Sequence, residues 1–187
     1  MKKTRFPIHR IVINAVMIAL YVILSTFLTI PLGGLKLTVE ATPVILCAIV
    51  FGPVDAAIVG GVAELLNQML TFGFTPTTAL WILPAVVRGL FVGLCLLPIK
   101  KRGSDLRKGY GIILYYIICL VGAVLVSCLN TFTLYVDSKM FGYYSYAMVF
   151  GSFLIRILTG LVSTAAMATV CLPVAAALKK AKLVPER

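Results

Sequence analysis

Residues 110–136 read YGIILYYIICLVGAVLVSCLNTFTLYV, and this run decides the fold. It contains no charged side chain. At 1.5 Å per residue, a helix of this length is longer than the roughly 30 Å of hydrocarbon in a bilayer. The stretch therefore predicts a helix that crosses a membrane.

Similar apolar runs lie on both sides of this one. Of the 187 residues, 61% are hydrophobic and 12% are charged, and the mean hydropathy is +1.07. Soluble domains typically carry about 25% charged residues. We therefore predict an all-α integral membrane bundle of six transmembrane helices. Residues 1–187 are expected to form a single transmembrane substrate-binding domain, with no room for a soluble enzyme.

The predicted helices cover residues 11–30, 43–51, 55–72, 79–98, 110–136 and 147–178. The second is short and contains Pro43. We favour a tilted span for it, and the alternative is a re-entrant hairpin made with the third segment. The first segment imitates a signal peptide, but it has spanning length and lacks an A-x-A cleavage site. It is predicted to be a retained first helix.

The basic residues are concentrated in three short stretches. One precedes the first helix, one separates the fourth from the fifth, and one follows the sixth. Thirteen of the 17 lie there: Lys2, Lys3, Arg5, Arg10, Lys100, Lys101, Arg102, Arg107, Lys108, Lys179, Lys180, Lys182 and Arg187. Cytoplasmic loops of membrane proteins carry such an excess of Lys and Arg. The pattern predicts cytoplasmic N- and C-termini, and it explains the net charge of +11 without a nucleic-acid partner.

Known catalytic patterns are missing from the chain. There is no G-x-x-x-x-G-K-[ST] motif, and the single histidine, His9, lies at the predicted cytoplasmic edge. The five cysteines form no CxxC pair, and the carboxylates are scattered, so neither a metal site nor a cofactor is predicted. We expect no enzymatic activity.

Three ionisable residues fall inside predicted helices, where charges are costly and mark functional sites. Glu64, Arg88 and Arg156 lie on three helices at similar depth. Residues spaced by three or four positions share a helix face. By this spacing, Asn67 and Gln68 share a face with Glu64, and Trp81 and Pro84 share one with Arg88. Ser152, Thr159 and Ser163 share a face with Arg156. On the fifth helix, Ser127, Asn130 and Leu134 lie on one face, and Thr131 is next to them. The pattern predicts one outward-facing pocket with net positive charge.

A structural interpretation of the same residues stays open. Glu64 could form a buried ion pair with one arginine, and Trp81 could sit in an aromatic belt. That arrangement leaves the second arginine without an acidic partner in the bilayer. An anionic ligand would fill this role, because a guanidinium binds a carboxylate bidentately, and the single indole could stack on a ring.

Two stretches resemble the substrate-binding S-components of energy-coupling-factor (ECF) transporters. PVILCAIVFGPVDAAIVGG (residues 43–61) resembles their short second helix, GP turn and Gly-rich third helix. In NAVMIALY, Ala15 and Ala19 match the small-xxx-small motif by which the first helix docks on the coupling subunit. The sequence SCLNTFTLYVDSKMFGYY followed by FLIRIL is similar to folate-type members, which carries over to Asn130, Thr131 and Arg156.

The resemblance implies a function for the predicted pocket. The chain is expected to capture a vitamin, folate as first choice and pantothenate as the alternative, in the bacterial cytoplasmic membrane. The expected binding residues are Glu64, Asn67, Gln68, Trp81, Arg88, Asn130, Thr131 and Arg156. The expected partners are an ECF transmembrane coupling subunit and two cytoplasmic ATPase subunits. Two other classes stay open, an autonomous small secondary transporter or channel and an assembly protein.

Overall fold

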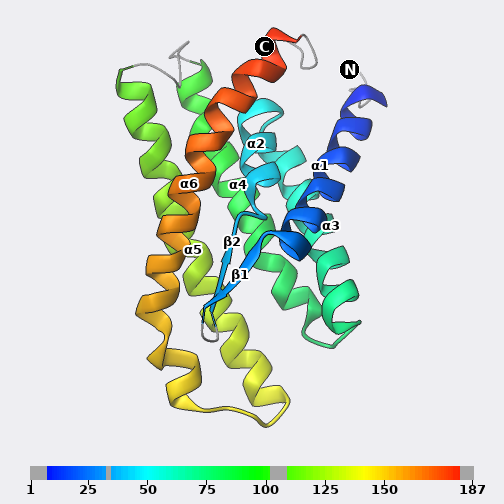
Figure 1. The fold of residues 1–187 in the computed structure, drawn as a ribbon, viewed down its shortest axis with the longest axis vertical. Coiled ribbons are helices and arrows are strands. Elements are labelled where there is room, and N and C mark those ends of the chain that lie inside the picture. The colour runs from blue at the N-terminus through cyan, green and yellow to red at the C-terminus, as the bar shows by residue number, and fades with distance from the viewer. Residues whose placement is uncertain (1–7, 33–34, 102–108, 182–187) are drawn as a thin grey trace.

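The computed structural model describes residues 8–32, 35–101 and 109–181 and shows a bundle of helices with one small hairpin (Figure 1). The elements in chain order are α1 (Ile8–Phe27), β1 (Thr29–Leu32), β2 (Leu35–Thr38), α2 (Thr42–Val50), α3 (Pro53–Phe72), α4 (Thr78–Lys101), α5 (Tyr110–Met140), the π-helix η1 (Ala147–Gly151) and α6 (Phe153–Lys180). The predicted helical class is confirmed, and each predicted segment overlaps a helix.

Four stretches within the described helices are long and apolar enough to cross a membrane: Arg10–Phe27, Thr78–Lys100, Tyr110–Met140 and Ala147–Leu178. Their outer faces carry exposed apolar side chains such as Leu154, Leu158 and Val162. Exposed apolar surface of this extent is unusual on a soluble monomer and is expected against lipid. The chain is therefore a helical membrane protein.

The start of α1 and the end of α6 lie at one end of the bundle, which we call the terminal end (Figure 1). Arg10 near the start of α1 forms an ion pair with Asp55 at the start of α3. Near the end of α4, the Lys100 Nζ atom donates a 3.1 Å hydrogen bond to the carbonyl of Ala48 in α2. Four helix ends therefore meet there. Most of the basic residues counted above (2, 3, 5, 102, 107, 108, 182 and 187) lie outside the described residues.

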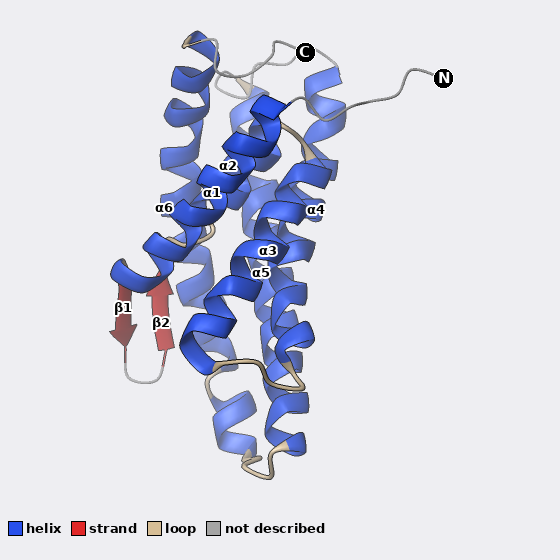
Figure 2. Cartoon of the chain, turned by 90° about the vertical axis from the view of Figure 1, so that its right-hand side faces the viewer, coloured by secondary structure: helices blue, strands red, loops and turns tan. Residues whose placement is uncertain are grey.

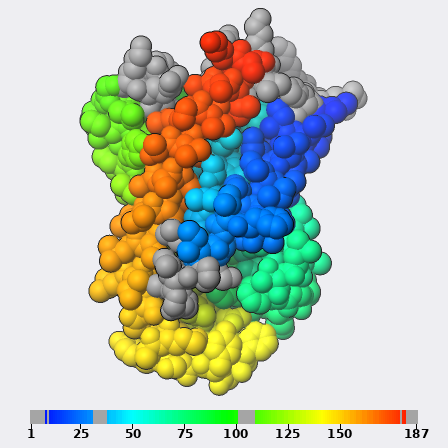
Figure 3. All heavy atoms as spheres, in the orientation of Figure 1, coloured from blue at the N-terminus to red at the C-terminus, as the bar shows by residue number. Residues whose placement is uncertain are grey.

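The second helix differs from its prediction as a tilted span. The nine residues of α2 measure about 14 Å, less than half the thickness of the hydrocarbon. Residues 43–49 are all buried, and α2 shows at the surface only as a narrow cyan strip between α1 and α6 (Figure 3). Its length therefore rules out a crossing by α2 alone. Strand β2 and α2 together lead from the hairpin to the terminal end (Figure 2).

The hairpin after α1 was not predicted. Strands β1 and β2 pair antiparallel, with Thr29 opposite Thr38 and Leu32 opposite Leu35. The all-α prediction is therefore right for the helices and wrong for this segment, where strands of four residues are too short to show a period of two. The hairpin matters for the site because it brings Thr38 and Glu40 to the cavity described below.

Helices α3 and α4 pack closely because glycines line their contact. A Cβ atom on Gly60 would lie 2.7 Å from the carbonyl oxygen of Ala85, and one on Gly89 would lie 2.6 Å from the carbonyl carbon of Ala56. Small residues allow such close approach of membrane helices. This contact places Glu64 of α3 and Arg88 of α4 on neighbouring helices.

Candidate ligand-binding site

A cavity of about 1020 Å³ lies among the helices, away from the terminal end. Helices α1 and α3, which start at the terminal end, contribute residues from their second halves, such as Ser25 and Asn67. Helix α4, which ends there, contributes Trp81 and Arg88 from its first half. The cavity therefore occupies the half of the bundle farther from both termini, as expected for an outward-facing pocket.

Seven of the eight residues predicted to bind substrate line this one cavity. They are Glu64, Asn67, Gln68, Trp81, Arg88, Asn130 and Arg156. The eighth, Thr131, is not among the lining residues. Its hydroxyl donates a 2.9 Å hydrogen bond to the carbonyl of Ser127, and its side chain is buried. The helix-face pattern thus brings the predicted residues together, while their role in binding stays a prediction.

Glu64 is held by two neutral donors rather than by an arginine. The Tyr21 hydroxyl donates to Oε2 at 2.7 Å, and the Gln68 amide donates to Oε1 at 2.8 Å. Glu64 forms no ion pair within the described residues. The alternative of a Glu64–arginine pair is therefore not what the structure shows.

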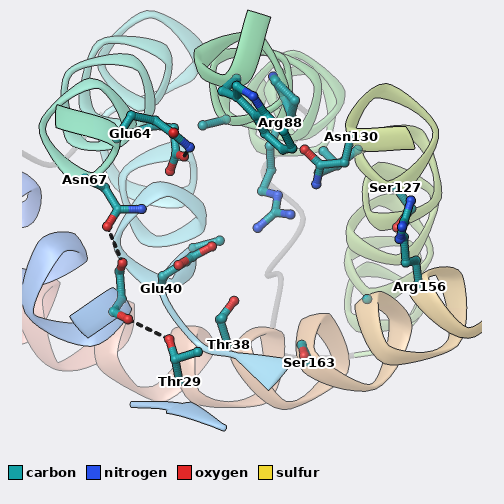
Figure 4. A pocket seen from close by; sticks show the side chains of 18 of the residues that line it. Thr29, Thr38, Glu40, Glu64, Asn67, Arg88, Ser127, Asn130, Arg156 and Ser163 are labelled. Carbon is teal, nitrogen blue, oxygen red and sulfur yellow. Dashed lines mark hydrogen bonds between the residues drawn. The ribbon is translucent and has the colours of Figure 1, made fainter. Parts of the chain in front are cut away.

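Arg88 extends from α4 into the cavity (Figure 4). Its Nε atom is buried and has no hydrogen-bond partner among the residues that the structure describes. A buried donor without a partner costs about 1–3 kcal/mol, and more for a charged group. The guanidinium, which projects into the cavity, is placed to bind an acceptor supplied by a ligand.

Arg156 lies across the cavity from Glu64 and Asn67 (Figure 4) and is already partnered. Its guanidinium donates to the carbonyls of Met148 at 2.9 Å and Val149 at 3.2 Å. Both acceptors belong to η1, and π-helical turns of this kind occur frequently at functional sites. The two arginines have similar sequence surroundings, but they differ in their hydrogen-bond partners.

Asp137 at the end of α5 collects three donors near the outer end of the cavity. It accepts hydrogen bonds from the hydroxyls of Thr77 and Tyr143, and from the Trp81 Nε1 atom at 3.4 Å. Burial, followed by the hydrogen bond and negative charge of Asp137, raises the pKa of Tyr143 to about 12. Tyr143 therefore remains a protonated donor at neutral pH. This cluster fixes the edge of the Trp81 indole.

The prediction of a net positive pocket is wrong. Glu40, Glu64 and Asp137 line the cavity together with Arg88 and Arg156, so carboxylates outnumber guanidiniums. From the sequence, Glu40 and Asp137 are counted among carboxylates scattered along the chain, because each lies just outside an apolar run. The hairpin and the length of α5 bring them in. The cavity therefore offers both strong acceptors and strong donors.

Two residues of α1 were also missed. Tyr21 and Ser25 line the cavity, and Ser25 donates a 2.6 Å hydrogen bond to the Asn67 side-chain oxygen. The Asn67 amide nitrogen then points toward the cavity (Figure 4). The sequence did contain a signal for them, because they are two polar side chains four residues apart on one face of an apolar helix.

A helical membrane bundle that encloses a polar cavity in one half defines a membrane-embedded small-molecule-binding protein. Residues 5–180 match the model of the family described as ECF-type riboflavin transporter, S component. One similar solved structure is the S component of a bacterial ECF transporter, at 24% identity and a TM-score of 0.61, covering 91% of this chain and 97% of that one. Another is FolT bound with folic acid, at 20% identity and a TM-score of 0.58, covering 92% and 97%. No curated protein sequence matches the chain.

The chain belongs to the family of ECF-type riboflavin transporter S components. It is thus a substrate-binding subunit of an ECF-type vitamin transporter and not an enzyme. The predicted resemblance to ECF S-components is confirmed. Proteins of this class bind a vitamin and work with an ECF coupling module.

Proposed function

We propose that the chain captures folate from the outer side of the bacterial cytoplasmic membrane. The observation that carries this proposal is Arg88, whose guanidinium is directed into the cavity and forms no ion pair within the described residues. A carboxylate is the acceptor that fits a guanidinium best, because both N–H groups of one edge can be satisfied at once. Folate carries two carboxylates on its glutamate tail.

The acidic residues support the same ligand from its other end. The pterin ring of folate presents an amino group beside a ring N–H, and a carboxylate accepts from both. Glu64 and Glu40 both line the cavity and are candidates for this contact. A volume of about 1020 Å³ is at the upper end of ordinary ligand sites, which favours folate over the smaller pantothenate.

Riboflavin is the second candidate, and the description of the matched family favours it. Its ring also carries an N–H between two carbonyls, and its ribityl chain could use the hydroxyls and amides of the cavity. Riboflavin has no carboxylate, however, so it offers Arg88 only neutral acceptors. The two vitamins therefore differ in the acceptor that they offer to Arg88: a carboxylate in folate and neutral oxygen or nitrogen atoms in riboflavin.

The proposed transport step needs partners. Six crossings place both termini in the cytoplasm: the four apolar spans, α3, and a second crossing that β2 and α2 complete together. The cavity then faces the outside. An ECF coupling subunit and two cytoplasmic ATPase subunits supply the energy for release inward, and Ala15 and Ala19 dock on the coupling subunit.

Purified protein is expected to bind folate without ATP or partner subunits. Trp81 is the single tryptophan of the chain and lines the cavity, so its fluorescence reports occupancy directly. Titrations with folate, pantothenate, riboflavin and thiamine, each repeated by calorimetry, would rank the ligands. Tight binding of riboflavin with none of folate would replace the first candidate by the second, and no binding of any vitamin would contradict both.

Trp81→Ala is expected to weaken folate binding by about 1–3 kcal/mol, or roughly 5- to 150-fold, through loss of ring stacking. Trp81→Phe is the matched control, because it keeps an aromatic face and removes the N–H donated to Asp137. We expect Trp81→Phe to lose only a few-fold in affinity, measured by calorimetry. Equal losses in the two variants would show that the contact with Asp137, and not stacking, matters.

A further inference from the structure

Helix α1 is joined to α3 by a row of hydrogen bonds. The Asn14 amide donates to Asp55 at 2.9 Å, the Tyr21 hydroxyl to Glu64 at 2.7 Å, and the Ser25 hydroxyl to Asn67 at 2.6 Å. We call these three pairs the α1–α3 ladder. The donors are spaced by seven and four residues, so they share one face of α1.

The ladder has one step at the terminal end and two steps at the cavity. Asp55 is almost fully buried beside Arg10 and is not among the cavity-lining residues. Glu64 and Asn67 both line the cavity. Displacement of α1 would therefore disturb two cavity residues directly. The Asn14–Asp55 pair provides a matched contact outside the site.

Tyr21 determines how Glu64 faces the cavity. Tyr21 and Glu64 are 3% and 8% exposed, so the hydrogen bond between them is largely shielded from water. With Tyr21 on Oε2 and Gln68 on Oε1, the plane of the carboxylate is fixed by two donors. The lone pairs that remain are those available to a ligand.

Another face of α1 is free of the bundle. Ala15 and Ala19 are exposed, and at 3.6 residues per turn they lie about 120° around the helix from the ladder donors. The same helix thus carries the proposed docking strip on one face and two hydrogen bonds to the cavity on another.

We propose that Tyr21 and Ser25 are positioning residues for the ligand site, and that through them the position of α1 and the affinity for the vitamin are coupled. The inference rests on the proposed function, because it takes Glu64 and Asn67 as ligand contacts. When the coupling subunit displaces α1, the two hydrogen bonds at the cavity break and the affinity falls. By linkage, the vitamin in turn changes the affinity for the coupling subunit by the same factor.

Tyr21→Phe tests the positioning role in the isolated full-length protein. The variant keeps the ring and removes the hydroxyl, and we expect the Kd for folate to rise about 10-fold, as loss of a hydrogen bond to a charged group does. Asn14→Ala is the control, because it removes the step of the ladder that lies away from the cavity. Its Kd is expected within about 2-fold of the wild type, even where both variants lower the thermal midpoint.

The coupling is measured by repeating the titrations with the reconstituted coupling module. The ratio of the docked Kd to the free Kd should be well above one for the wild type and Asn14→Ala. It should fall toward one when Tyr21→Phe is combined with Ser25→Ala. An unchanged ratio, or wild-type affinity in Tyr21→Phe, would overturn this inference alone. A wild-type protein that binds neither folate nor riboflavin would overturn the proposed function, and the inference with it.

Discussion

Arg88→Met is expected to weaken folate binding by about 2–5 kcal/mol, from roughly 30-fold to a few thousand-fold in Kd. The physical reason is that the ligand carboxylate would lose a charged partner in a site shielded from water. The unliganded protein should not lose stability, because its buried Nε atom has no partner to give up among the described residues. Calorimetric titration and the thermal midpoint without ligand measure the two quantities separately.

Arg156→Met removes the same charge from another wall of the cavity. Its guanidinium is bonded to the carbonyls of Met148 and Val149, so its loss leaves acceptors without donors around η1. Because Arg156 also lines the cavity, we expect Arg156→Met to lower both the thermal midpoint and the affinity, whereas Arg88→Met lowers the affinity alone. If Arg88→Met binds folate as the wild type does, Arg88 is not the partner of the ligand carboxylate, and the main argument for folate over riboflavin is lost.

This contrast between two arginines could not be obtained from the sequence. Both lie in apolar helices, and each is flanked by polar residues at helical spacing. The spacing correctly predicted which faces meet, because a helix fixes the direction of its side chains. It says nothing of η1, whose carbonyls bind Arg156 after a local change in the helix.

The errors in the predicted charge have a similar origin. Glu40 follows a four-residue strand, and Asp137 is the first residue past the predicted end of the fifth helix. Neither position repeats with a period that a sequence pattern could detect. Tyr21 is a different case, because tyrosine in an apolar run is equally typical of a lipid interface. Only its 2.7 Å contact with Glu64 places it at the site.

The short second helix shows where composition alone misleads. Residues 43–49 are apolar enough for lipid, yet all are buried inside the bundle. Apolar composition does not distinguish a lipid-facing surface from a protein core, and length is the better guide. For α1 the same ambiguity matters functionally, because a strip of small residues could pack inside the bundle or face a partner.

The structure bears on that question, since Ala15 and Ala19 are exposed. A shallow apolar groove between α1 and α3, lined by Ala19, Ile23 and Leu66 among others, continues the strip along the surface. Figure 3 shows α1 at the surface of the bundle. A partner helix could approach closely here, because alanines leave little side chain between two backbones.

Replacing both Ala15 and Ala19 with leucine is therefore expected to abolish uptake and co-purification with the coupling subunit, while folate affinity stays within about 2-fold of the wild type. Added side chains on an exposed strip block close contact without disturbing the core. The control is Ala166→Leu with Val170→Leu, an exposed pair at the same spacing on α6, which should transport normally. Uptake is measured in vesicles that carry the full complex, and affinity in the isolated variant. Normal transport by the α1 variant would refute the docking proposal, whereas joint loss of folding and binding would show that the strip packs inside the bundle.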